Sequence, residues 1–144
     1  MKDSKIIYIN LQQAIELHNW IIDRTGGKQI EDCARLEKIL QQIKSDRDYP
    51  EFKHKLTQLI FAINKSDRAI PDSKRLSLAL GCYFLELNGY DYVVHYFAEE
   101  MENIVIWLEK EKINRELLIE IIKSLLCAED YSEELKLRIA NCIS

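Results

Sequence analysis

The chain places two cations next to an acidic residue at one predicted helix start. Lys74 and Arg75 form the only dense basic cluster in the sequence, and they follow Pro71, Asp72 and Ser73. A helix start presents unpaired backbone N–H groups and the positive end of the helix dipole, which together bind phosphate and other anions. A carboxylate at the N-cap hydrogen-bonds those same groups and repels an incoming anion. We therefore predict that Asp72 caps this helix and occupies its anion site from inside the chain. Lys74 and Arg75 are then expected to pair with Asp72 or Asp67 instead of a nucleotide.

The other residues with catalytic or metal-binding side chains give weaker signals. The four cysteines lack the C-x-x-C spacing of zinc and redox motifs, so no metal site is predicted. His18 lies on or beside an apolar helical stripe, where a packed histidine is more common than a catalytic one. No Ser-His-Asp order or glycine-rich phosphate loop is present. Two acidic clusters are typical of solvated helix faces: Glu99-Glu100 with Glu102, and Glu129-Asp130 with Glu133-Glu134.

Apolar residues recur at helical spacing along most of the chain. Asn10 and Gln13 form a capping box for the first helix, which Gly26-Gly27 ends. Strand signal is confined to a short extended lead-in at residues 6–9 and a possible short hairpin near residues 44–49. The further amphipathic helices are predicted at residues 31–43, 52–64, 92–110, 114–126 and 132–143.

The most informative helix is predicted from about Asp72 to Asn88. Apolar residues between Leu76 and Leu87 cover nearly its whole circumference, and Gly89 closes it. A helix that is apolar all round belongs in the middle of a bundle. The sequence therefore predicts an all-α bundle of six or seven helices around one buried central helix, in a single domain spanning residues 1–144.

Composition and charge limit the classes of partner. The chain is 47% hydrophobic and 31% charged, as an ordinary globular protein is. Its formal net charge of -4 argues against nucleic-acid binding, which needs clustered cations. The charged start and the short apolar run Ile6 to Ile9 suit neither a signal peptide nor a membrane span. We expect a cytoplasmic protein that binds no nucleic acid and no membrane.

The segment Leu56 to Tyr90, LTQLIFAINKSDRAIPDSKRLSLALGCYFLELNGY, resembles the core of the Fic/Doc family, specifically its Doc (death-on-curing) toxin branch. The family has a helix ending near "INK", a loop and helix start of the form H-x-F-x-D-G-N-K-R, and a buried helix closing on "FL-x-x-NGY". The helix from Ala14 to His18, followed by Gly26-Gly27, also looks like the opening helix of Doc proteins. The resemblance covers roughly residues 8–126, with residues 127–144 forming a C-terminal helix, and it implies a Fic/Doc-type bundle.

The family's catalytic motif is replaced. Asp67 stands where the resemblance implies the catalytic histidine, and Pro71 where it implies the acidic magnesium ligand. Ala69, Asp72 and Ser73 replace the packing phenylalanine, the glycine and the asparagine, while Lys74 and Arg75 remain. An ordinary aspartate is a poor base near neutral pH, and proline has no side-chain oxygen for magnesium.

Two functions follow as expectations. The first is a catalytically degenerate Doc-like protein, derived from a toxin–antitoxin system, that acts as a binding or regulatory scaffold with no cofactor. The resemblance implies a protein partner, an antitoxin segment bound beside the start of the central helix. The alternative is a transferase of phosphoryl, nucleotidyl or glycosyl groups to a protein. It would use Asp67 as base and Ser73, Lys74 and Arg75 to hold Mg-ATP or a nucleotide-sugar. A plain interaction module outside this biology is a third possibility.

Overall fold

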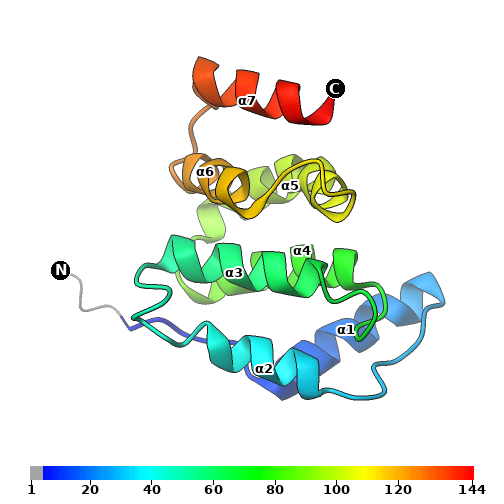
Figure 1. Ribbon diagram of the computed structural model, residues 1–144. Coiled ribbons are helices and arrows are strands. Elements are labelled where there is room, and N and C mark those ends of the chain that lie inside the picture. The colour runs from blue at the N-terminus through cyan, green and yellow to red at the C-terminus, as the bar shows by residue number, and fades with distance from the viewer. Residues whose placement is uncertain (1–4) are drawn as a thin grey trace.

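The computed structural model describes residues 5–144, which form an all-α bundle (Figure 1). The described residues contain no strand, so the predicted all-α class is confirmed. The first four residues of the charged start lie outside the described part. A short 3₁₀ helix, η1 (Asp91–Val93), precedes α5. The seven α-helices of the described chain are α1 (Leu11–Thr25), α2 (Ala34–Gln42), α3 (Phe52–Asn64), α4 (Ser73–Leu87), α5 (Val94–Glu109), α6 (Arg115–Leu126) and α7 (Glu133–Ile143).

The central helix lies where the sequence predicts it. Asp72 and Asn88 occupy the two cap positions of α4. The helix packs against α3, α5 and α1, and Leu76, Leu80 and Phe84 are completely buried. A side chain at Gly81 would bring its Cβ to 2.8 Å from Ile60 Cδ1, so glycine lets α3 approach α4 closely. α3 and α4 together form the centre of the core: no residue of α3 is exposed, whereas α4 exposes Arg75 and Glu86.

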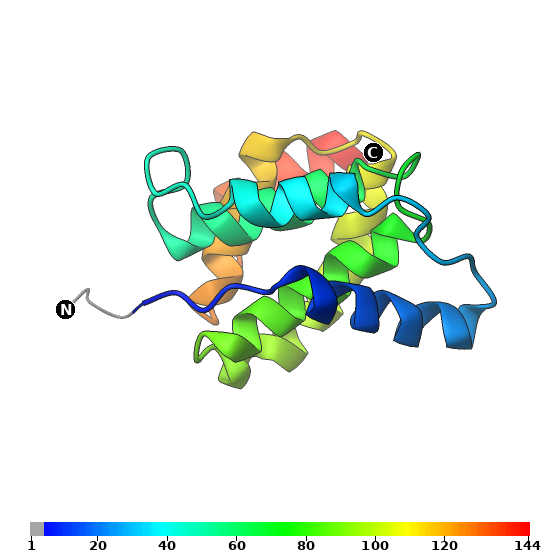
Figure 2. The same ribbon diagram turned by 90° about the horizontal axis from the view of Figure 1, so that it is seen from below.

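The helices stack in pairs, with α1 beside α2, α3 beside α4 and α5 beside α6 (Figures 1 and 2). Figure 2 shows α1 and the segment leading into it lying along α4. The last helix, α7, lies at the outer end of the stack and contacts α6. It buries only Leu135 and Ile139. No helix in the described residues has the length and apolar character needed to cross a membrane.

The start of α1 has the predicted capping box. Asn10 Oδ1 accepts from the backbone N–H of Gln13, and Gln13 Oε1 accepts from that of Asn10. The helix ends at Gly26, whose φ of 77° lies in the left-handed region that favours glycine. The extended residues 6–9 before α1 pair with no strand of the described chain, and their backbone contacts a side chain of α4's C-cap instead. The amide of Asn88 hydrogen-bonds both the N–H and the C=O of Ile7, at 2.8 and 2.9 Å.

Two predicted helix starts differ from the structure. The helix predicted from Glu31 begins at Ala34, because residues 31–33 form a turn in which the Asp32 carboxylate accepts from the Ala34 N–H. The helix predicted from Tyr92 begins as the 3₁₀ turn η1.

The short hairpin predicted near residues 44–49 is wrong. These residues form turns, and the buried ammonium of Lys55 fixes them to α3. It lies 2.8 Å from the carbonyl oxygen of Ile43 and 2.9 Å from a carboxylate oxygen of Asp46. The anchor comes from the next helix along the chain, so the local strand signal could not reveal it.

Candidate functional site

The loop at residues 65–72, between α3 and α4, carries most of the predicted site residues and is held at several points. Ser66 donates to the carbonyl of Ala62 at 2.7 Å and accepts from Arg35 Nε at 2.9 Å. Ile70 is fully buried and anchors the loop in the core. Lys65 donates to the carbonyl of Leu108 at the end of α5. The loop is thus tied to α2, α3 and α5.

His18 joins α1 to the same loop. Its side chain is fully buried, and its Nε2 lies 2.7 Å from the carbonyl oxygen of Pro71. Because that oxygen can only accept, Nε2 carries the proton and donates. Nδ1 has no hydrogen-bond partner among the described residues. His18 is therefore a packed histidine, as the sequence predicts, and its hydrogen bond positions Pro71, the residue before Asp72.

Asp72 occupies the N-cap position of α4, but its side chain does not cap the helix. Its backbone has a φ of 55°, in the left-handed region, and its carboxylate makes no hydrogen bond to a helix amide. One carboxylate oxygen accepts from Arg75 Nη1 at 3.0 Å, and the other accepts from the Thr25 hydroxyl at 3.3 Å. A Cβ on Gly27 would lie 2.6 Å from this carboxylate. The prediction that Asp72 hydrogen-bonds the free amides is therefore wrong, because the backbone turns the side chain toward Arg75 and α1.

Both cations of the predicted anion site face carboxylates. Arg75 pairs with Asp72, and Lys74 Nζ lies 3.3 Å from Glu109 Oε1 at the end of α5. Ser73 is buried, and its hydroxyl donates inward to the carbonyl of Asn64 at 3.3 Å. Asp67 is exposed, and its carboxylate has no hydrogen bond or ion pair within residues 5–144. The structure thus brings Asp72 and Arg75 together, and leaves Asp67 and Ser73 outside that cluster.

A separate groove of about 520 Å³ runs between α1 and the second half of α4. Its apolar surface comes mainly from Leu17, Ala79, Tyr83 and the exposed Trp20, whose ring carries the guanidinium of Arg24 3.7 Å above its centre. Two carboxylates, Glu16 and Glu86, line it as well. An apolar channel flanked by acidic groups suits a ligand with an apolar body and positive charge.

Cys82 also lines this groove and has a perturbed thiol. Burial and the charge of Glu86 raise the pKa of Cys82 from 9.0 to about 11. The thiolate is the reactive form of cysteine, so this side chain remains a thiol near neutral pH. Cys82 therefore contributes apolar surface and no nucleophile.

Several residues at the loop escape sequence reasoning, namely Thr25, Arg35 and Glu109. They come from distant parts of the chain, and no local motif marks them. The described residues contain no group of three or more His, Cys, Asp or Glu side chains placed to hold a metal ion.

No protein-family model, curated protein or solved structure matches this chain significantly.

Proposed function

We propose that the chain is a catalytically degenerate Doc-like protein of the cytoplasm, derived from a toxin–antitoxin system, that works as a binding or regulatory scaffold. The observation that carries this proposal is the pairing of both motif cations with carboxylates, Arg75 with Asp72 and Lys74 with Glu109. Phosphoryl transfer depends on positive charge around the transferred group. Here that charge is already balanced by the chain, and Pro71 offers no side-chain ligand for magnesium.

The groove between α1 and α4 supports a protein partner. Helix-in-groove recognition requires an apolar channel that fits one face of an amphipathic helix. Trp20 is 55% exposed, although the Arg24 guanidinium covers one face of its ring, and an exposed aromatic side chain is a common anchor of interfaces. Glu16 and Glu86 favour basic residues beside the apolar face of the partner. The occupant we propose is an amphipathic helical segment with basic flanks, bound along the second half of α4 and not beside the start of the helix, where the resemblance implies an antitoxin segment.

A pair of synthetic peptides tests this scaffold function. One carries a leucine stripe flanked by lysines, and the other carries the same stripe flanked by glutamates. Isothermal titration should show binding of the lysine peptide only. Trp20→Ala should weaken it by a factor of about 30, since anchor residues contribute about 2 kcal/mol. Tyr92→Ala, at another exposed aromatic side chain, is the matched control and should bind normally. Equal binding of both peptides, or an unchanged affinity of Trp20→Ala, would contradict the proposal.

One observation favours the alternative, a transferase with altered chemistry. The Lys74–Glu109 pair is partly exposed, with side chains 37% and 44% accessible. Exposed ion pairs contribute only about 0–1 kcal/mol, so an anionic donor has little to displace. Under this function Lys74 and Arg75 hold a nucleotide or nucleotide-sugar, and Asp67 acts as base. Nucleotide binding that requires both cations distinguishes the two functions.

A further inference from the structure

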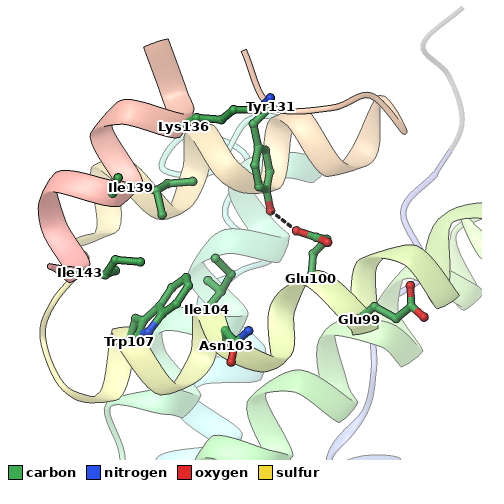
Figure 3. Close-up of a pocket in the computed structure, with 10 residues that line it drawn as sticks. Glu99, Glu100, Asn103, Ile104, Trp107, Tyr131, Lys136, Ile139 and Ile143 are labelled. Atoms are coloured by element: carbon green, nitrogen blue, oxygen red, sulfur yellow. Dashed lines mark hydrogen bonds between the residues drawn. The ribbon is translucent and has the colours of Figure 1, made fainter. Parts of the chain in front are cut away.

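A second cavity lies between α5 and α7 (Figure 3). Its volume is about 240 Å³, enough for a small organic molecule. Figure 3 shows Ile139 and Ile143 projecting from α7 toward the face of α5 that carries Ile104 and Trp107. These four side chains make the cavity largely apolar. Because nonpolar surface of this kind binds an apolar group well, the body of a ligand would rest here.

One end of the cavity carries a fixed negative charge. Glu100 lines it, and the Tyr131 hydroxyl donates to Glu100 Oε1 at 3.1 Å. Figure 3 shows this bond joining the two side chains across the cavity end opposite Trp107. Burial, with the charge of Glu100, raises the pKa of Tyr131. The phenol therefore keeps its proton and holds one carboxylate oxygen, which leaves Glu100 Oε2 free for a ligand.

The spacing along α5 sets the length of the ligand. Glu100, Ile104 and Trp107 share one helix face because they are four and three residues apart. Seven residues of helix separate the carboxylate from the indole by about 10 Å. A ligand whose aromatic or aliphatic group packs on Trp107 and Ile104 thus needs only a short linker for its cationic group to reach Glu100. The indole face and the carboxylate both attract positive charge.

The cation that lines the cavity does not cancel this charge. Lys136 Nζ pairs with Glu133 Oε2 at 3.2 Å, and the Lys136 side chain is 51% exposed. Glu99 lies at the outer end of the cavity, where its carboxylate is 3.2 Å from His95 Nε2. Glu100 is therefore the carboxylate placed to receive a ligand.

We propose that the cavity between α5 and α7 binds a small organic ammonium ion, with its apolar body between Trp107 and Ile139 and its nitrogen at Glu100. The site shares none of its lining residues with the groove between α1 and α4 or with the α3–α4 loop. It is independent of the function proposed above. A ligand held by both α5 and α7 also fastens the outermost helix to the bundle.

Three probes of similar size test this site: 2-phenylethylammonium, the neutral 2-phenylethanol and the anion phenylacetate. Fluorescence is followed in Trp20→Phe, which leaves Trp107 as the single tryptophan reporter. Saturable binding of the ammonium ion at millimolar concentration, with much weaker binding of the other two, is expected. Equal affinity for the cation and the alcohol, or no saturable change with the cation, would overturn the proposal. This comparison needs no variant in the cavity itself.

Glu100→Gln provides the second test, because glutamine still accepts from Tyr131 but has no charge. Since hydrogen bonds to charged groups contribute about 1.5–3 kcal/mol, the affinity for 2-phenylethylammonium should fall at least about tenfold. Glu102→Gln is the matched control, since Glu102 is an exposed carboxylate on the same helix that does not line the cavity. Equal losses in the two variants would show a general charge effect and overturn the proposal. Unchanged thermal midpoints would confirm that both variants fold.

Discussion

At the residue scale, the backbone of Asp72 decides what its carboxylate does. A φ of 55° is uncommon outside glycine, although aspartate tolerates it better than most residues. In this conformation the carboxylate points to Arg75 and Thr25 and away from the free amides of α4. A glycine at this position would have no such side chain. Asp72 therefore both adds negative charge at the helix start and supplies a partner for Arg75.

Asp72→Gly should restore anion binding at the start of α4. It removes the carboxylate and frees Arg75, and glycine favours the left-handed backbone. The gain from relieved strain and the loss of an ion pair worth about 0–1 kcal/mol nearly cancel, so the thermal midpoint should change little. Titration with inorganic phosphate should show binding absent from the original chain. Asp72→Asn, which removes only the charge, should show a smaller gain. No phosphate binding in either variant would contradict this account.

Cys82 should make the fold sensitive to alkaline pH. Its pKa is raised in the folded state, so the protonated form is favoured there and ionisation favours unfolding. The stabilisation is complete below pH 9.0 and is lost as the pH rises to about 11. A pKa shift of this size corresponds to about 2–3 kcal/mol of unfolding free energy. Urea unfolding across this range should show a smaller loss of unfolding free energy in Cys82→Ala than in the original chain. Parallel pH profiles would contradict the prediction.

At the element scale, the two caps of α1 and the end of α4 were predictable, whereas the starts of α2 and α5 and the loops were not. Asn10, Gly26 and Asn88 act within a turn of their own helices, so local sequence reveals them. The turn at residues 44–49 depends on Lys55, and the loop at residues 65–72 depends on His18. The hydrophobic pattern shows only whether a position is polar or apolar. It therefore could not reveal that the polar side chains of Lys55 and His18 are buried and hold these loops. The Asp72–Arg75 pair was predictable because the two residues are three apart in the sequence, whereas Glu109, the partner of Lys74, comes from the end of α5.

Asp46→Asn should loosen the turn that follows α2. It leaves the fully buried Lys55 ammonium without its charged partner. Because Asp46 is 83% exposed, solvent reduces the loss to about 1 kcal/mol of unfolding free energy. Denaturant unfolding of Asp46→Asn and of the control Asp48→Asn measures the difference. Among the described residues, the Asp48 carboxylate contacts only the exposed Arg47 and the Ser45 hydroxyl, and asparagine can still accept the hydrogen bond from Ser45. Equal stabilities of the two variants would be inconsistent with a structural ion pair at Lys55.

At the scale of the whole molecule, packing becomes sparser from the centre of the bundle to its last helix, so we expect local stability to decrease in the same direction. α4 is surrounded by α1, α3 and α5, whereas α7 buries two side chains. Regions with few buried apolar contacts open more readily. The two proposed binding surfaces differ in this respect, since the α1–α4 groove borders the densely packed α4 and the α5–α7 cavity borders the sparsely packed α7.

Hydrogen exchange should show the gradient directly. Backbone amides of α7 should exchange faster than those of α4 by a factor of about 100 or more, because local opening of α7 costs less than global unfolding. Addition of 2-phenylethylammonium should slow exchange in α7 and leave α4 unchanged. Equal protection of the two helices in the free protein would contradict the packing argument.

The thermal unfolding midpoint with and without Mg-ATP, UDP-sugars and dTDP-sugars tests the central claim most directly. A ligand that binds only the folded state must raise the midpoint. The account predicts no shift with any of these ligands, because Lys74 and Arg75 already face carboxylates. A shift that disappears in Lys74→Ala/Arg75→Ala would contradict the degenerate scaffold and favour the transferase with altered chemistry.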